Sequence, residues 1–276
     1  MMDAGKRRAY LSAMGIQGWV RREGEAEQAA AVDETAAPPG NTEPSLQGEA
    51  QAAAASPVPD SVAAVALDLR QDRPSPPGAA DPRLAQAVVP AGHDWAGLEA
   101  AVAACTACDL HRDRTQTVFG IGDRQAALMI VGEAPGAEED RLGEPFVGRA
   151  GQLLDQMLRA IELERRRVYI TNVVKCRPPN NRNPHADEIA SCIGYLQRQI
   201  TLVAPRVILV LGRIAANSLL GTDATLASLR GRAHQRDGVP VVVTYHPAYL
   251  LRTPRDKAKS WADLRRVQRL LQEAPA

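Results

Sequence analysis

Short apolar runs alternate with helical patterns through the second half of the chain. Near-continuous apolar runs predict buried strands over 127–131, 168–174, 207–211 and 239–243. Between and after these runs, apolar residues recur every three or four positions. This spacing predicts helices over 151–161, over about 184–200 with Asn183 as the N-cap, over 214–220 and over 257–271. Strands that are apolar throughout are buried on both sides, so the pattern predicts an α/β domain whose mainly parallel sheet is covered by helices on both faces.

The pattern is lost before Trp95. Residues 1–95 are rich in Ala, Pro, Glu, Gly and Ser, and they cannot bury enough apolar surface to offset the entropy of ordering them. We expect this region to be a largely disordered extension and residues 96–276 to form one domain. Residues 5–22 are an exception, because large apolar side chains stand there between basic clusters. Two interpretations stay open for them: a short helix that folds back onto the domain, or a tethered peptide that docks on a partner protein.

Charge separates the same two regions. From Gly97 onward the chain has 25 Lys and Arg residues against 19 Asp and Glu residues, whereas the whole chain of 276 residues has 33 against 32. A basic domain behind an acidic extension is compatible with a polyanionic partner, although many solvated surfaces carry a similar excess. No apolar run reaches the length of a membrane span, and the N-terminus lacks the apolar core of a signal peptide. We therefore expect a cytoplasmic protein that does not associate with membranes.

All four cysteines lie in the predicted domain. Cys105 and Cys108 form a C-x-x-C pair, Cys176 follows the second predicted strand, and Cys192 lies on the next predicted helix. Four thiolates can hold Zn²⁺ or an iron–sulfur cluster. A zinc ribbon usually repeats the close pair, whereas the second two cysteines are far apart here, which favours [4Fe–4S]. Four ordinary buried cysteines are the simplest alternative, and a redox-active pair is disfavoured because Cys105 does not follow a strand.

Polar motifs lie at or near the ends of three of the predicted strands. Residues 132–136 (GEAPG) come after the first strand, Asn172 stands within the second, and His246 follows the fourth; residues 143–148 (GEPFVG) lie between the first two strands. Ligands of parallel sheets bind beyond the carboxyl ends of the strands. A lone Asn or His at such a place is more often structural than catalytic. Three polar positions at separate strand ends, beside a C-x-x-C pair, favour a catalytic site.

Together these segments resemble the family 4 uracil-DNA glycosylases, the iron–sulfur branch of that superfamily. The resemblance covers about 105–271 and rests on the motifs GEAPG, PFVG, TNVVKCRPP and HPAYLLR, in this order, with all four cysteines in place. It implies a three-layer α/β/α sandwich with a central four-stranded, mainly parallel sheet. It also implies one [4Fe–4S] cluster on Cys105, Cys108, Cys176 and Cys192 that organises the fold and the DNA-binding loops. The activity that it implies is hydrolysis of the N-glycosidic bond of uracil in DNA, which leaves an abasic site during base excision repair.

The resemblance also implies roles for the residues at the strand ends. A glycosylase must take its target nucleotide out of the base stack, and Phe146 is expected to stack on the flipped uracil. Asn172 can donate to uracil O4 and accept from N3–H, and cytosine presents the reverse pattern. Gly132 and Ala134 are expected beside the same base. His246 is expected to donate a hydrogen bond to uracil O2 and to stabilise the leaving anion.

The group that positions the attacking water is a separate question. In the family 1 enzymes the first motif reads GQDPY and its Asp assists the water, whereas Ala134 stands at that place here. Glu133 is the nearest candidate for positioning water or for offsetting the positive charge that develops on the sugar.

The expected partner is uracil-containing DNA, bound by a monomer. Leu250, Leu251 or Arg252 is expected to enter the minor groove and fill the gap left by the flipped base, and Lys175 is expected to contact a phosphate. Some relatives trap DNA covalently through a KRRIH insertion that this chain lacks, so turnover is expected. Two other classes of protein stay open: a non-catalytic iron–sulfur DNA-binding module of the same fold, and a zinc-stabilised scaffold whose N-terminal peptide recruits a partner.

Overall fold

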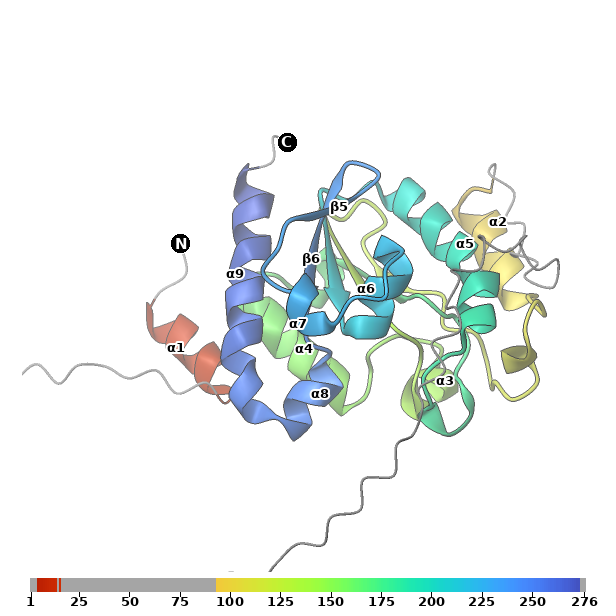
Figure 1. Cartoon of the computed structure of the whole chain (residues 1–276), viewed down its shortest axis with the longest axis horizontal. Helices are drawn as coiled ribbons and strands as arrows, with labels where there is room; N and C mark the ends of the chain where they lie inside the picture. Colours follow the sequence, from red (N-terminus) through yellow and green to blue (C-terminus); the bar gives the residue numbers. More distant parts are fainter. Residues whose placement is uncertain (1–3, 14, 16–92, 274–276) are drawn as a thin grey trace, which may run out of the picture. The chain divides into compact units, whose positions relative to one another are not determined.

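A six-stranded sheet forms the centre of the computed structural model, which describes residues 4–13, 15 and 93–273 (Figure 1). Its strands are β1 (Ile121–Gly122), β2 (Leu128–Gly132), β3 (Tyr169–Asn172), β4 (Val207–Leu211), β5 (His234–Arg236) and β6 (Val239–Thr244). Their order across the sheet is β1-β3-β2-β4-β6-β5. The four central strands run parallel, and β1 and β5 pair antiparallel at the two edges.

The mainly parallel α/β sheet is confirmed, but the predicted number of four strands is too low. The four apolar runs are β2, β3, β4 and β6, and the two edge strands are additional. β1 has two residues and β5 has three, and neither strand is buried. Such short edge strands carry no apolar period by which the sequence could reveal them.

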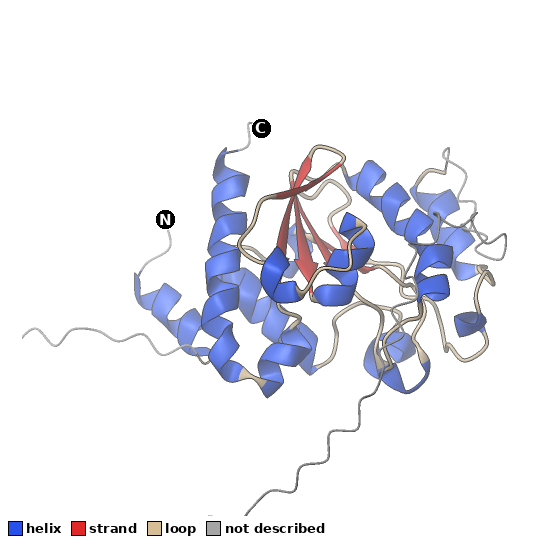
Figure 2. Cartoon of the chain, in the orientation of Figure 1, coloured by secondary structure: helices blue, strands red, loops and turns tan. Residues whose placement is uncertain are grey.

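Helices cover both faces of the sheet (Figure 2). The helices of the described chain are α1 (Ala4–Ala13), α2 (Trp95–Ala103), α3 (Ala137–Leu142), α4 (Arg149–Ala160), α5 (Ala186–Val203), α6 (Arg213–Leu220), α7 (Leu226–Leu229), α8 (Pro247–Arg252) and α9 (Lys257–Glu273). Single turns of 3₁₀ helix, η1 to η4, lie at Asp109–His111, Arg165–Arg167, Pro179–Asn181 and Pro254–Asp256. No helix within the described ranges is long and apolar enough to cross a membrane.

Two hydrophobic cores lie on opposite faces of the sheet. Along β2, Met129 and Val131 belong to the core shared with α2, α5 and α6, whereas Leu128 and Ile130 belong to the core shared with α4, α8 and α9. This alternation follows from the two-residue period of a strand, in which successive side chains point to opposite faces. Because both faces are covered, the strand is apolar throughout, as the sequence pattern predicts.

Two local expectations differ from the structure. The helix predicted to begin after Asn183 begins at Ala186, because the Glu188 carboxylate accepts a hydrogen bond from the backbone N–H of His185 at 2.7 Å and caps the helix there. The segment after His246, which is not among the predicted helices, forms the helix α8.

The beginning of the chain is described over a short stretch. Helix α1 contacts α4, and both interpretations of the 5–22 segment stay predictions. The rest of the 5–22 segment, apart from Gly15, and the remainder of the predicted extension up to Gly92 lie outside the described residues. Helix α2 begins at Trp95, near the place where we expect the domain to start.

A buried polar network joins β3 to α5. The Lys175 side chain is 1% exposed, and its Nζ donates to Thr171 Oγ1 at 2.7 Å, to the backbone oxygen of Asn172 at 2.7 Å and to Gln199 Oε1 at 2.6 Å. Gln199 Nε2 in turn donates to the backbone oxygen of Phe119 at 2.9 Å. Three acceptors match the three donors of an ammonium group, so the interior satisfies this buried amine completely.

Replacement of Lys175 by Met is expected to lower the free energy of unfolding by about 2–4 kcal/mol, because several hydrogen bonds are lost and their acceptors stay buried. Lys259 is the matched control, since its side chain is 58% exposed and forms a surface ion pair with Asp256 at 2.8 Å. Lys259→Met is expected to change the free energy of unfolding by less than about 1 kcal/mol. Urea denaturation followed by circular dichroism measures both, and equal stabilities of the two variants would contradict the role of the network.

Candidate active site

The residues predicted at the strand ends meet in one cavity at the carboxyl edge of the sheet. Gly132 ends β2 and pairs in register with Asn172, which ends β3, and His246 follows β6. The cavity has a volume of about 370 Å³. The predicted residues that line it are Glu133, Ala134, Phe146, Asn172, His246 and Arg252. Pro178, Asn181 and Arg182 close it on the side of η3.

Gly132 is required by the close approach of two side chains to its backbone. A Cβ at this position would lie 2.3 Å from Asn172 Oδ1 and 2.6 Å from Phe146 Cζ, closer than van der Waals contact allows. The glycine therefore lets the ring of Phe146 and the carboxamide of Asn172 converge over the end of β2. Its effect on the cavity is steric, and it explains why this position carries no side chain.

Phe146 stands in a loop with an unusual backbone conformation. We call residues 143–148 the Phe146 loop; within it, Phe146 has a φ of 55°, in the left-handed region that side-chain-bearing residues rarely adopt. The ring is buried, and its centroid lies 5.6 Å from that of the His246 ring, with an angle of 33° between the planes. Such a conformation costs about 1–3 kcal/mol and persists only where the surroundings hold it.

Glu139 holds part of this loop, and the sequence analysis did not identify it. Its Oε1 accepts hydrogen bonds from the backbone N–H of Val147 at 3.0 Å and of Gly148 at 3.1 Å, and its Oε2 accepts one from Gly136 at 3.1 Å. One carboxylate thus joins the GEAPG turn to the Phe146 loop. A Glu three residues after the Gly136 cap was the available signal, since this spacing is typical of a capping box.

The carboxamide of Asn172 is buried with one atom unpaired. Its Oδ1 has no hydrogen-bond partner among the residues that the structure describes. Leaving a buried acceptor unpaired costs about 1–3 kcal/mol, so most native proteins avoid it. An unpaired acceptor that lines a cavity is therefore suited to accept a hydrogen bond from a ligand.

The protonated nitrogen of His246 follows from the backbone around it. The N–H of Ala248 donates to His246 Nδ1 at 3.2 Å, so Nδ1 is an acceptor and the proton of the neutral ring is on Nε2. Burial lowers the pKa of His246 to about 4, the nearby Arg252 adds to this effect, and Glu139 opposes it. The ring is thus a neutral hydrogen-bond donor at physiological pH.

Glu133 is partly buried in the same cavity. Burial raises the pKa of its carboxyl to about 7, and the positive charge of Arg213 opposes the rise. Arg213 begins α6 after β4 and is another neighbour that the sequence analysis did not identify. A carboxyl with this pKa can exchange a proton near neutral pH, which is the range in which a general base is most effective.

The predicted DNA-contacting residues separate into two groups. Arg252 is exposed and lines the mouth of the cavity, and Leu251 is half-buried. Leu250 is 0% exposed and packs in the core shared with α4 and α9, and Lys175 is buried in the network described above. Neither Leu250 nor Lys175 reaches the surface, so the structure does not fit the expectation that these two residues contact DNA.

The four cysteines surround a second, smaller cavity. Cys105 and Cys108 are half-buried, Cys176 and Cys192 are buried, and all four line this cavity. Two donors point at the sulfurs: Arg114 Nη1 lies 3.1 Å from Cys176 Sγ, and the backbone N–H of Lys175 lies 3.3 Å from Cys192 Sγ. Arg114 is a further neighbour that sequence reasoning missed.

The four thiols form a candidate metal site. Among the described residues, no group of three His, Cys, Asp or Glu side chains is close enough to bind one metal ion. Four thiols around a shared cavity, with hydrogen-bond donors directed at two of them, are a donor set that suits an iron–sulfur cluster or a zinc ion.

Comparison with known proteins agrees with this geometry. The family model of the uracil DNA glycosylase superfamily matches residues 119–265. A type-4 uracil-DNA glycosylase of Archaeoglobus fulgidus is 42% identical over 177 residues, which is 61% of this chain and 89% of the relative. The enzyme of the same type from Pyrobaculum aerophilum is 46% identical over 168 residues, covering 58% of this chain and 86% of its own, and that of Thermotoga maritima is 47% identical over 150 residues, covering 54% and 78%. The chain therefore belongs to the uracil DNA glycosylase superfamily and, within it, to the type-4 uracil-DNA glycosylases.

Proposed function

We propose that the protein flips uracil out of DNA and hydrolyses its N-glycosidic bond, which leaves an abasic site for base excision repair. The type-4 relatives support the activity. The observation that carries the proposal is the pairing, in one cavity, of an unpaired buried acceptor on Asn172 with a neutral donor on His246. A flipped uracil offers N3–H to the acceptor and O2 to the donor.

Asn172 reads the base in this proposal. Its Oδ1 accepts from uracil N3–H and its Nδ2 donates to O4, so both faces of one carboxamide are used. Cytosine carries an acceptor at N3 and a donor at C4, and would leave buried groups unpaired, which costs about 1–3 kcal/mol per group. Phe146 stacks on the same ring and adds about 1–3 kcal/mol of binding.

His246 stabilises the leaving group. Cleavage of the bond between C1′ and N1 moves negative charge into the uracil ring, and Nε2–H donates to the O2 atom on which this charge concentrates. Because burial keeps the imidazole neutral, it acts as a fixed dipole in the cavity. Removal of one such donor typically costs 10²- to 10³-fold in rate.

Glu133 is the residue that we assign to the water. Ala134, beside it, has no group that could bind water, and the Glu133 carboxyl faces the same cavity. In its ionised form the carboxylate orients water toward C1′ and offsets the positive charge that develops on the sugar.

The DNA contacts that we propose involve Arg252 and Leu251. Arg252 stands at the mouth of the cavity and can bind a phosphate or enter the gap left by the flipped base. Leu251 is next to it on α8. Leu250, in contrast, anchors α8 in the core.

The four cysteines are the ligands that we propose for a [4Fe–4S] cluster. The cluster would supply a metal-centred cross-link between the segments that carry Cys105, Cys108, Cys176 and Cys192. Arg114 would offset part of its negative charge through the contact with Cys176. The expectations of a monomer, of a cytoplasmic location and of a partner for residues 5–22 stay predictions.

Uracil release tests the proposed function directly. Purified protein is expected to convert a uracil-containing oligonucleotide into an abasic product that alkali cleaves, and to turn over. His246→Ala is expected to reduce the rate at least about 10²-fold. Binding of the oligonucleotide without base release would instead identify a non-catalytic module, and a DNA adduct that survives denaturation would contradict turnover.

The pH dependence tests the assignment of Glu133. Its carboxylate forms as the pH rises through about 7, so the single-turnover rate is expected to rise through the same range. His246, with a pKa of about 4, stays neutral there and contributes no step above about pH 5. Glu133→Gln is expected to be slower and to lack the rise near pH 7. A wild-type rise that persists in Glu133→Gln would assign the titration to another group.

The metal content tests the cysteine site. Cys176→Ser and Cys192→Ser are expected to lose most of the iron, the acid-labile sulfide and the brown colour of the purified protein. Ser191→Ala is the matched control, because Ser191 lines the same cavity without a thiol and is expected to keep them. A colourless wild-type protein that contains zinc would overturn the cluster.

A further inference from the structure

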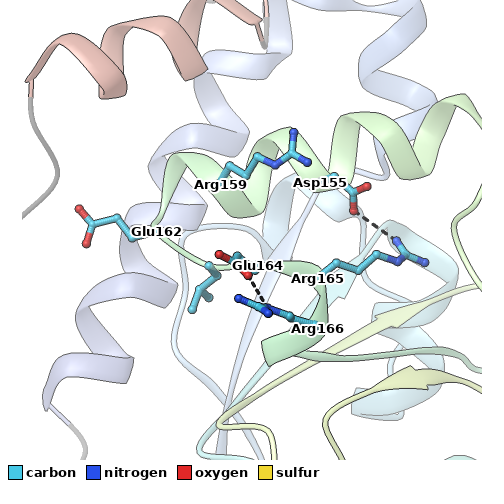
Figure 3. A pocket seen from close by; sticks show the side chains of 7 residues that line it. Asp155, Arg159, Glu162, Glu164, Arg165 and Arg166 are labelled. Carbon is cyan, nitrogen blue, oxygen red and sulfur yellow. Dashed lines mark hydrogen bonds and ion pairs between the residues drawn. The ribbon is translucent and has the colours of Figure 1, made fainter.

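A third cavity, larger than the two described above, lies between the end of α4 and η2 (Figure 3). Its volume is about 630 Å³, and its lining side chains are Asp155, Arg159, Glu162, Leu163, Glu164, Arg165 and Arg166. Figure 3 shows two ion pairs in it, Arg165 with Asp155 and Arg166 with Glu164. The mixed charges do not select one class of ligand. One of these side chains, that of Arg165, also contacts the Phe146 loop.

We propose that Arg165 is a positioning residue for Phe146, and that Asp155 holds Arg165 in place for this role. Arg165 Nη2 donates a hydrogen bond to the backbone oxygen of Pro145, the residue that precedes Phe146. Arg165 Nη1 lies 3.3 Å from Asp155 Oδ1, on α4. The inference rests on the proposed function, because Phe146 has a role only if a base stacks on it.

The backbone of Phe146 needs such support on both sides. Its φ of 55° is unfavourable, and relaxation to a negative φ would move the ring away from Gly132 and His246. On the C-terminal side, Glu139 binds the N–H groups of Val147 and Gly148. On the N-terminal side, the hydrogen bond from Arg165 holds the carbonyl of Pro145.

The packing of α4 fixes the direction of the peptide that follows Phe146. A Cβ on Gly151 would lie 1.7 Å from the backbone oxygen of Phe146, so this oxygen packs directly on the helix backbone. Asp155 stands on the same helix, one turn further along. Helix α4 therefore supports the loop twice, once directly and once through the pair of Asp155 with Arg165.

The chemistry of arginine suits this bridge. Its planar guanidinium donates in two directions at once, to a carboxylate and to a carbonyl, whereas the ammonium of lysine is a compact point charge on a flexible stem. The Arg165 side chain is 26% exposed, and that of Asp155 is 30% exposed, so both are partly shielded from water. Arg166 differs in its surroundings: its side chain is 81% exposed and pairs with Glu164, two positions earlier.

The test compares uracil release by Arg165→Gln, Arg165→Lys, Asp155→Asn and the control Arg166→Gln. We expect Arg165→Gln to lower kcat/KM about five- to tenfold, with most of the change in KM, because base stacking weakens while His246 and Asn172 stay in place. Arg165→Lys and Asp155→Asn are expected to show smaller losses in the same direction. Arg166→Gln is expected to stay within about twofold of the wild type.

A double-mutant cycle separates positioning from general destabilisation. In the Phe146→Ala background, Arg165→Gln is expected to have no further effect on kcat/KM, because no ring is left to position. Inhibition by free uracil is expected to weaken in Arg165→Gln by the same factor as KM rises. Thermal unfolding and visible absorbance of each variant show whether fold and metal centre are retained.

Three outcomes would overturn the inference: equal kcat/KM for Arg165→Gln and Arg166→Gln, a full effect of Arg165→Gln in the Phe146→Ala background, or unchanged inhibition by uracil. If Arg165→Gln does not fold, Asp155→Asn and Arg165→Lys carry the same comparison against Arg166→Gln. Absence of uracil release by the wild-type protein would contradict the proposed function itself, and is thereby distinguished from failure of the inference.

Discussion

The parallel pairing of β2 with β3 is the constraint on which the site depends. It sets Gly132 beside Asn172 at the edge of the sheet, and the missing side chain of the glycine leaves room for the ring of Phe146. The residue before Asn172 on β3, Thr171, points to the opposite face of the sheet, where it accepts a hydrogen bond from Lys175. One face of the sheet thus carries Asn172, the candidate base-reading group. The other face carries the buried network around Lys175, whose backbone N–H also donates to Cys192 Sγ.

Burial at the carboxyl edge of the sheet also changes the pKa values of the ionisable groups in the cavity. Burial favours the neutral form of both His246 and Glu133, so it lowers the pKa of the first and raises that of the second. An imidazole that donates without carrying charge and a carboxyl that ionises near neutrality are useful together, since the reaction separates charge between the sugar and the base. Arg252 lies near His246, and Arg213 lies near Glu133. Bound DNA would bring negatively charged phosphates toward these two positive charges.

The sequence predicts the parts of this arrangement that repeat with a period or form a motif. The run VILVL matches β4 at both ends, because a strand covered on two faces is apolar throughout. The strand-end motifs place Asn172, Phe146 and His246 in one cavity, as the resemblance implies. The strands β1 and β5 are too short to show a period, and the burial of Leu250 and Lys175 depends on which side of an element faces the core. Glu139 and Arg165 bind backbone atoms of the Phe146 loop. Every residue has a backbone carbonyl, and nearly every residue has a backbone N–H, so the sequence of the loop does not reveal these contacts.

The proline after His246 decides where the proton of the imidazole resides. Pro247 has no N–H, so the first backbone donor within reach of Nδ1 is that of Ala248, and this bond keeps Nδ1 without a proton. If His246 gave its Nε2 proton to the departing base, no second proton could enter the ring from the other side while this bond holds. On the proposed mechanism, His246 therefore keeps its Nε2 proton and donates only a hydrogen bond to the departing uracil anion. The histidine therefore meets each new substrate in the same tautomer, and no proton has to be added to it between turnovers.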